Sequence, residues 1–200
     1  MKRTLDLTVS IVALLALSPL LALIALAVRL ASPGPVFFRQ RRLGLGGRPF
    51  EILKFRSMHV GCPDLRNADG SARSGGDDPR VTPLGRFLRR TSLDELPQLW
   101  NVLRGEMSLV GPRPDQVDQL TYYLPQERRK LETRPGLTGL AQISGRNNIS
   151  WERRKQLDVE YVDRSSLALD LIILCKTIPY VLRHDGVYAA GAPPKENTCL

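Results

Sequence analysis

The sequence predicts an α+β fold: one mainly helical domain with a few short strands, an N-terminal re-entrant membrane helix hairpin, and amphipathic helices at the membrane interface. Three observations predict it. The run from Leu7 to Val28 contains no charged side chain. Apolar residues recur at helical spacing in three later segments, 84–103, 151–162 and 167–182. Only two short segments have the composition of strands.

The apolar run at the N-terminus would be roughly 33 Å long as a straight helix, enough to cross a bilayer core. Ser18 and Pro19 lie at its middle, and a proline there removes a backbone hydrogen bond and bends the helix. Because basic residues flank both ends, the positive-inside rule places both ends in the cytoplasm. A straight span and a secretory signal peptide remain open, but the pattern slightly favours a hairpin with Ser18 and Pro19 as the break.

The next segments predict strands and a loop. Residues 31–35 contain helix breakers and end the apolar run. Residues 36–38 and 50–55 are predicted as two strands around the glycine-rich turn at 44–47. The stretch 62–80 has almost no apolar residue, which predicts a mobile surface loop long enough for a lid or a functional insert.

The second half of the chain is predicted to be mainly helical. Residues 84–103 form one helix, 112–133 contain another that begins near Pro114, and 151–162 form a third. Residues 136–148 are a glycine-punctuated loop. The apolar segment 167–182 is short for a spanning helix and better suited to lying at a membrane interface.

Charge and composition limit the classes of partner. The net charge of +9 and the pI of about 9.9 favour anionic partners: phosphates, anionic lipid or nucleic acid. Aromatic residues make up only 6% of the chain, too few for stacking on single-stranded bases, so we expect no nucleic acid. Two histidines, His59 and His184, do not suit a Ser/His triad or a zinc site.

Two adjacent carboxylates, Asp94 and Glu95, stand where a helix is expected to begin. Ser92 and Glu95 have the spacing of a capping box, and Asp94 could equally cap the helix. The same position suits chemistry, because a helix N-terminus favours an ionised Asp and binds phosphate. An ionised carboxylate beside phosphate and a divalent cation can attack phosphorus. The motif alone leaves both interpretations open.

Basic residues around this pair favour the chemical interpretation. Lys54 and Arg56 are expected on one face of a strand. Three arginines, Arg86, Arg89 and Arg90, precede the pair. Three more lie in turns or loops that proline and glycine hold rigid, which suits a bidentate clamp on a pyrophosphate: Arg113, Arg134 and Arg146.

These segments resemble a small monotopic phosphoglycosyl transferase of the bacterial sugar transferase family. The resemblance runs in family order from about residue 3 to about residue 187, and corresponds to the minimal form of the family. An ordered set of motifs is far more specific than any one of them. The motifs are LSPL at 17–20, KFRSM at 54–58, SLDELPQ at 92–98, NVLRGEMSLVGPRP at 101–114, RPGLTG at 134–139 and LDVEYV at 157–162.

The resemblance implies a reaction. Asp94 would be the nucleophile that displaces UMP from a UDP-sugar and forms a covalent phosphosugar–enzyme intermediate. Glu95 would assist with Mg²⁺, held by Asp94 and Glu95, and with activating a polyprenyl (undecaprenyl) phosphate, which then attacks the intermediate. The product is a polyprenyl diphosphate sugar, the first intermediate of glycoconjugate or exopolysaccharide assembly. Ser18 and Pro19 would break a re-entrant helix.

The resemblance also implies an organisation: a re-entrant membrane helix (1–33), a catalytic domain (34–187) on the cytoplasmic face of the bacterial inner membrane, and a tail (188–200). The alternative is a non-catalytic, membrane-tethered basic protein that binds anionic lipid or nucleic acid. The resemblance and the pinned arginines together give the expected substrate-binding set: Lys54, Arg56, Arg90, Arg113, Arg134, Gln142, Arg146 and Asp158.

Overall fold

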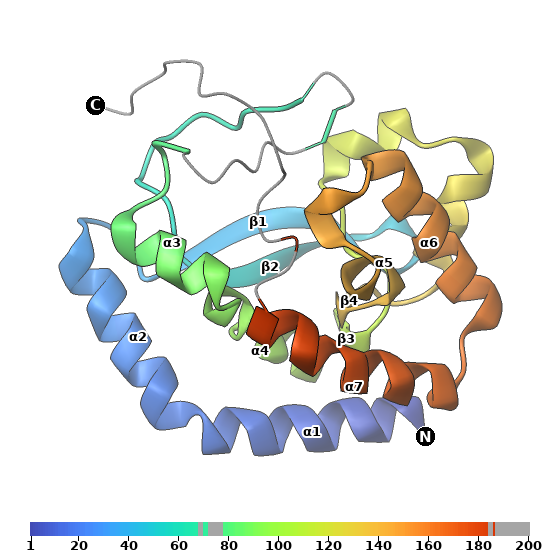
Figure 1. Ribbon diagram of the computed structural model, residues 1–200, viewed down its shortest axis with the longest axis horizontal. Coiled ribbons are helices and arrows are strands. Elements are labelled where there is room, and N and C mark those ends of the chain that lie inside the picture. The colour runs from blue at the N-terminus through green and yellow to red at the C-terminus, as the bar shows by residue number, and fades with distance from the viewer. Residues whose placement is uncertain (68–69, 72–77, 184–185, 187–200) are drawn as a thin grey trace.

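The computed structural model describes residues 1–67, 70–71, 78–183 and 186, so the tail at 188–200 and part of the 62–80 loop lie outside the described residues. The described part is mainly helical with a few short strands, as predicted (Figure 1). In chain order its elements are α1 (Lys2–Ala16), α2 (Ser18–Ala31), β1 (Phe37–Leu43), η1 (Leu45–Gly47), β2 (Pro49–Phe55), α3 (Pro83–Arg90), η2 (Leu93–Glu95), α4 (Gln98–Arg104), β3 (Ser108–Val110), η3 (Val117–Tyr122), η4 (Pro125–Glu132), β4 (Gly136–Thr138), α5 (Leu140–Ile143), η5 (Arg146–Asn148), α6 (Trp151–Arg164) and α7 (Leu167–Arg183).

The apolar run forms two helices that meet at a bend of 64°. Pro19 has no N–H to give to the carbonyl of Leu15, and the hydroxyl of Ser18 donates to that carbonyl instead, at 2.8 Å. None of the helices in the described residues is by itself long and apolar enough to cross a membrane. The bent pair α1 and α2 together meets that test by length and composition.

The beginning of α1 is bound to the rest of the domain by buried polar contacts. The ammonium of Lys2 lies 2.5 Å from the carboxylate of Asp170 on α7. The carboxylate of Asp6 accepts hydrogen bonds from the hydroxyl of Ser108 and the N–H of Leu109, both at 3.0 Å. In Figure 1, α1 accordingly lies along one edge of the molecule with its N-terminus beside α7.

Strands β1 and β2 form the predicted antiparallel hairpin, with a register from Phe37 opposite Phe55 to Leu43 opposite Pro49. Gly46 and Gly47 in the turn have φ angles of 65° and 74°, which only glycine adopts without strain. The first strand is longer than predicted because its basic second half also pairs with β2. A second sheet, the parallel pair β3 and β4, is absent from the sequence prediction because three-residue strands leave no periodic pattern.

The single helix predicted over 84–103 is wrong. Ser92 adopts a left-handed conformation, with φ at 57°, and divides the segment into α3, η2 and α4. The helix predicted within 112–133 is also replaced, by the two 3-10 helices η3 and η4. Helices α6 and α7 form where they were predicted.

The main core lies between α4, β3, α6 and α7. Ala13 and Leu14 of α1 pack against it. The outward faces of α1, α2 and α7 keep large apolar side chains exposed, among them Leu15, Leu30 and Leu182. The buried members of the core are Ile52, Leu99, Val102, Met107, Leu109, Val110, Tyr161 and Ile173.

Candidate active site

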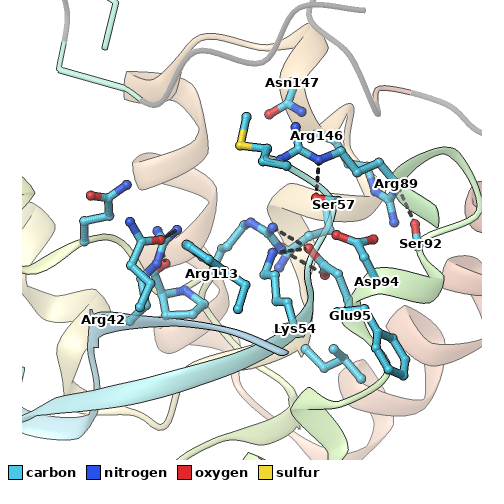
Figure 2. Close-up of a pocket in the computed structure, with 18 of the residues that line it drawn as sticks. Arg42, Lys54, Ser57, Arg89, Ser92, Asp94, Glu95, Arg113, Arg146 and Asn147 are labelled. Carbon is cyan, nitrogen blue, oxygen red and sulfur yellow. Dashed lines mark hydrogen bonds and ion pairs between the residues drawn. The ribbon is translucent and has the colours of Figure 1, made fainter. Parts of the chain in front are cut away.

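A cavity of about 1240 Å³ opens between the β1–β2 hairpin, η2 and the helices α5, α6 and α7. It exceeds the usual size of a drug-sized ligand pocket, so it has room for a large substrate. Asp94 and Glu95 lie in its wall, and basic side chains from several elements surround them (Figure 2). The cavity therefore unites most of the residues singled out in the sequence.

The carboxylate pair lies on η2, a single 3-10 turn, and helix α4 begins only at Gln98. Ser92 makes no side-chain capping bond, so the capping-box interpretation is wrong. Its hydroxyl instead accepts a hydrogen bond from Arg146 at 3.3 Å. Neither carboxylate therefore caps the N-terminus of a helix.

Glu95 is held by two cations. Its Oε1 lies 2.7 Å from Nζ of Lys54 and 2.7 Å from a guanidinium nitrogen of Arg113 (Figure 2). Burial disfavours the charged carboxylate, but Arg113 and Lys54 outweigh burial and keep the pKa of Glu95 well below its usual value. Glu95 is therefore ionised and fixed in position.

Asp94 has no such partners. It is 6% exposed, and within the described part of the chain its carboxylate forms no hydrogen bond or ion pair. Burial, reinforced by the neighbouring charge of Glu95, raises the pKa of Asp94 to about 6, although Lys54, Arg89 and Arg113 act in the opposite direction. At neutral pH this carboxylate is ionised with its oxygens unoccupied, which is the state a nucleophile requires.

Arg89 faces the cavity, whereas the predicted Arg90 is exposed and lies outside it. The Nε–H of Arg89 donates to the hydroxyl of Ser57 at 2.8 Å. Gly85 sets this orientation: a Cβ at position 85 would lie 2.0 Å from the carbonyl oxygen of Ser57, so only glycine lets α3 approach so closely. Arg89 follows Gly85 by four residues and shares its helix face. That spacing is the signal by which the sequence could have distinguished Arg89 from Arg90.

Arg42 is a second basic residue that the sequence prediction missed. It donates to the carbonyl of Pro114 at 3.2 Å and to the side chain of Gln40 at 2.6 Å. Burial, with the nearby Arg113, lowers the pKa of Arg42 to about 10. Among the described residues neither Arg42 nor Arg89 forms an ion pair with a carboxylate, so both can meet an anionic substrate.

Two predicted substrate ligands make other contacts. Arg56 lies at the cavity edge, but its guanidinium donates to two carbonyls just beyond the end of α2, at 2.7 Å to Ser32 and 2.8 Å to Pro33. It therefore ties the end of α2 to the strand that bears Lys54. Arg134 is exposed, lies outside this cavity and donates to the carbonyl of Gly105 at the end of α4.

The remaining predicted residues do line the cavity. Gln142 is 6% exposed, and neither its Oε1 nor its Nε2 has a hydrogen-bond partner in the described residues. Arg146 reaches Ser92 from η5. Asp158 is deeply buried behind Arg113, and its Oδ1 accepts the backbone N–H of Arg113 at 3.4 Å.

The two carboxylates fit the demands of Mg²⁺. This hard cation is commonly held by one or two carboxylates together with substrate phosphates and water. No cluster of three or more potential ligand side chains occurs in the part of the chain that the structure describes, so phosphate oxygens would have to complete such a site. Asp94 and Glu95 are the residues that would hold the cation.

Known proteins resemble the chain over most of its length. A sequence profile of the family described as bacterial sugar transferase matches residues 1–184. An uncharacterized sugar transferase, EpsL, of Bacillus subtilis (strain 168) is 48% identical over 94% of this chain and 90% of its own length. The UDP-glucose:undecaprenyl-phosphate glucose-1-phosphate transferase of Caulobacter vibrioides is 46% identical over 94% of this chain and 72% of its own.

A larger relative shows the same likeness. The undecaprenyl-phosphate galactose phosphotransferase of Salmonella typhimurium is 42% identical over 94% of this chain, which spans 42% of that protein. The profile match and these identities agree with the paired carboxylates and the basic cavity. The chain belongs to the bacterial sugar transferase family.

Proposed function

We propose that the chain transfers a sugar 1-phosphate from a UDP-sugar to a polyprenyl phosphate and releases UMP. The observation that carries the proposal is the contrast within the pair: Glu95 is clamped by Lys54 and Arg113, whereas the buried Asp94 carboxylate is unoccupied. Two relatives are named for transfer of a sugar phosphate to undecaprenyl phosphate, which supports this substrate class.

The reaction proceeds in two displacements. A carboxylate oxygen of Asp94 attacks the phosphorus that bears the sugar, and the bond from that phosphorus to the bridging oxygen breaks, so UMP leaves with the electron pair. An oxygen of the polyprenyl phosphate then attacks the same phosphorus. The bond to Asp94 breaks, the carboxylate is regenerated, and a polyprenyl diphosphate sugar leaves.

The basic residues stabilise charge during both displacements. Lys54 and Arg113 keep Glu95 ionised, so it would remain available to hold Mg²⁺ beside the substrate phosphates. Arg42 and Arg89 have donors directed at neutral groups, so an arriving pyrophosphate gains charge-assisted bonds without breaking ion pairs. Bound Mg²⁺ would supply neutralisation of charge on the pyrophosphate.

The bent pair α1 and α2 is proposed as a re-entrant hairpin that holds the catalytic domain against the cytoplasmic face of the inner membrane. Three features support this: the 64° bend, the exposed apolar faces of α1, α2 and α7, and the attachment of Lys2 to the domain. A polyprenyl phosphate presents its phosphate at that surface, and UDP-sugars are cytosolic. No observation favours the non-catalytic alternative.

The test is formation of the covalent intermediate. The protein is incubated with Mg²⁺ and a mixture of UDP-sugars, without lipid, and its intact mass is measured. We expect a gain of one phosphosugar, release of one equivalent of UMP, and discharge on addition of undecaprenyl phosphate. UMP release that requires the lipid, with no adduct at any time, would replace this route with direct transfer. No UMP release under any condition would overturn the function itself.

A further inference from the structure

Lys130 is a buried lysine that the proposed reaction does not use. It lies on η4, is 4% exposed, and its ammonium contacts the carboxylates of Asp115 at 2.9 Å and Asp158 at 2.7 Å. The hydroxyl of Tyr123 donates to the same oxygen of Asp115 at 2.5 Å. Burial opposes the charge on Lys130, but the two carboxylates outweigh it and raise its pKa well above the usual value. A charged group in this position calls for an explanation, because an apolar side chain could fill the space without desolvating a cation.

Both carboxylates are joined to the turn that carries Arg113. This stretch, residues 111–115 and called the Arg113 turn below, begins with a bend at Gly111 and ends at Asp115, two residues after Arg113. Asp158 accepts the backbone N–H of Arg113 through Oδ1 while Oδ2 contacts Lys130. The ammonium of Lys130 therefore contacts this segment twice. It contacts Asp115 of the segment directly, and it contacts Asp158 of α6, which in turn binds the backbone of Arg113.

The orientation of Arg113 depends on this turn. Its side chain is 40% exposed, and it meets the half-buried Glu95 at 2.7 Å. Two nitrogens of its guanidinium meet the Glu95 carboxylate, at 2.7 and 3.4 Å, so a shift of the turn would displace the guanidinium from this paired contact. A misplacement of about 1 Å at a catalytic group can lower the rate about 100-fold.

We propose that Lys130 is a positioning residue for the transfer reaction: it fixes the Arg113 turn so that the guanidinium meets Glu95 and the substrate phosphates. The inference rests on the proposed function for the role of Arg113. The proposal also gives Asp158 a supporting role: its two oxygens are already bonded within the protein, one to the backbone of Arg113 and one to Lys130. Lys130 belongs to none of the motifs by which the family was recognised.

A double-mutant cycle tests whether Lys130 acts through Arg113. Lys130→Met is measured in the wild-type chain and in Arg113→Ala, with kcat/KM for UMP release and the melting temperature as separate readouts. We expect a loss of up to about 100-fold in the wild-type background and less than about threefold in Arg113→Ala. Equal losses of kcat/KM in both backgrounds would overturn the proposal, because a purely structural role lowers activity whether or not Arg113 is present.

Lys155 supplies a matched control. It is also a buried lysine, 6% exposed, and its ammonium pairs with Glu127 at 2.7 Å without touching the Arg113 turn. Lys155→Met should therefore destabilise the protein to a similar degree, while its effect on kcat/KM combines additively with that of Arg113→Ala. If Lys155 couples to Arg113 as strongly as Lys130 does, the coupling reports general destabilisation and the proposal fails.

Hydrogen exchange provides a readout that is independent of the reaction. Pro112 and Pro114 lack N–H groups, so the amide of Arg113 is the only one in this three-residue stretch. We expect its exchange to accelerate at least about tenfold in Lys130→Met and to be unchanged in Lys155→Met. Unchanged exchange in Lys130→Met would overturn the proposal even if the chain transferred no sugar phosphate at all.

A charge-matched variant keeps the test valid if Lys130→Met does not fold. Lys130→Met combined with Asp115→Asn removes one positive and one negative charge and retains the Asp158 acceptor for Arg113. It should show the same coupling to Arg113 and the same faster exchange. Wild-type activity and exchange in this folded variant would contradict the role of Lys130.

Discussion

Replacing Asp94 with asparagine should abolish turnover and at the same time stabilise the protein. The carboxylate is buried at 6% exposure without a hydrogen-bond partner in the described residues, next to the ionised Glu95. Its charge therefore costs free energy in the folded state. A neutral carboxamide of nearly the same shape removes that cost, but it is a far weaker nucleophile.

The magnitude follows from the pKa of Asp94. A rise from 3.8 to about 6 corresponds to roughly 3 kcal/mol of destabilisation at neutral pH, at about 1.36 kcal/mol per pKa unit. The buried carboxamide also lacks a partner, which offsets about 1 kcal/mol or more of the gain. The net gain is about 1–2 kcal/mol, or a rise of about 2–8 °C in melting temperature for a chain of this size.

The pH dependence gives this prediction a second signature. The pKa of Asp94 is raised in the folded state, so between pH 3.8 and about 6 the folded protein holds a proton that the unfolded chain has released. The stability of the wild type therefore falls as pH rises through this window. The advantage of Asp94→Asn should be full above pH 6 and should vanish as pH approaches 4.

Thermal unfolding in detergent and UMP release measure the two effects. Turnover should fall roughly 10⁴-fold or more, as for other covalent nucleophiles. Glu95→Gln is the matched control, because it breaks contacts with Lys54 and Arg113 and should lower the melting temperature at neutral pH. An Asp94→Asn variant that is less stable than wild type at pH 7.5, or keeps a tenth of its rate, would refute the reasoning.

Three further predictions follow from the site and the hairpin. The rate of UMP release should fall about tenfold per pH unit below pH 6, because Asp94 must be ionised to attack; a rate that stays constant down to pH 5 would exclude that requirement. Arg89→Ala should weaken UDP-sugar binding more than Arg90→Ala, measured by KM or calorimetry, and the reverse order would contradict the assignment of Arg89 to the cavity. Replacing Ser18 and Pro19 with Ala and Leu should straighten the hairpin and move the N-terminus outward. In spheroplasts, and on a background without the native cysteines, a cysteine at position 2 should then react with an impermeant maleimide. Labelling of this cysteine in the parent, which keeps Ser18 and Pro19, would instead show that the helix spans the bilayer.

The sequence predicted the centre of the site better than its periphery. Asp94, Glu95, Lys54 and Arg113 lie in dense local motifs, and the cavity brings them together. Arg90 was chosen for the expected substrate-binding set instead of Arg89 because the choice between neighbouring arginines depends on the rotational phase of α3. That phase is set by the contact of Gly85 with Ser57, a residue far away in the sequence.

The fold was predicted where local pattern determines it. The β1–β2 hairpin has clear turn residues, and α6 and α7 have clear periodicity. The left-handed Ser92 was not predictable, because a serine gives no local signal for positive φ and tertiary contacts around η2 impose it. Arg56 was assigned to phosphate because alternation along a strand places it beside Lys54, but the strand ends at Phe55 and the alternation ends with it.

The attachment of α1 has a consequence for how this protein can be handled. Asp6 supplies the acceptor for two donors of β3, and Ala13 and Leu14 cover a core in which Val102 and Met107 have no exposed surface. A truncated chain that starts after α2 would expose that core and would leave the two β3 donors, the hydroxyl of Ser108 and the N–H of Leu109, without their acceptor. Helix α1 belongs to the same folding unit as the residues that line the cavity, so we expect a fragment without it to be unstable in solution, and purification should retain the whole N-terminus.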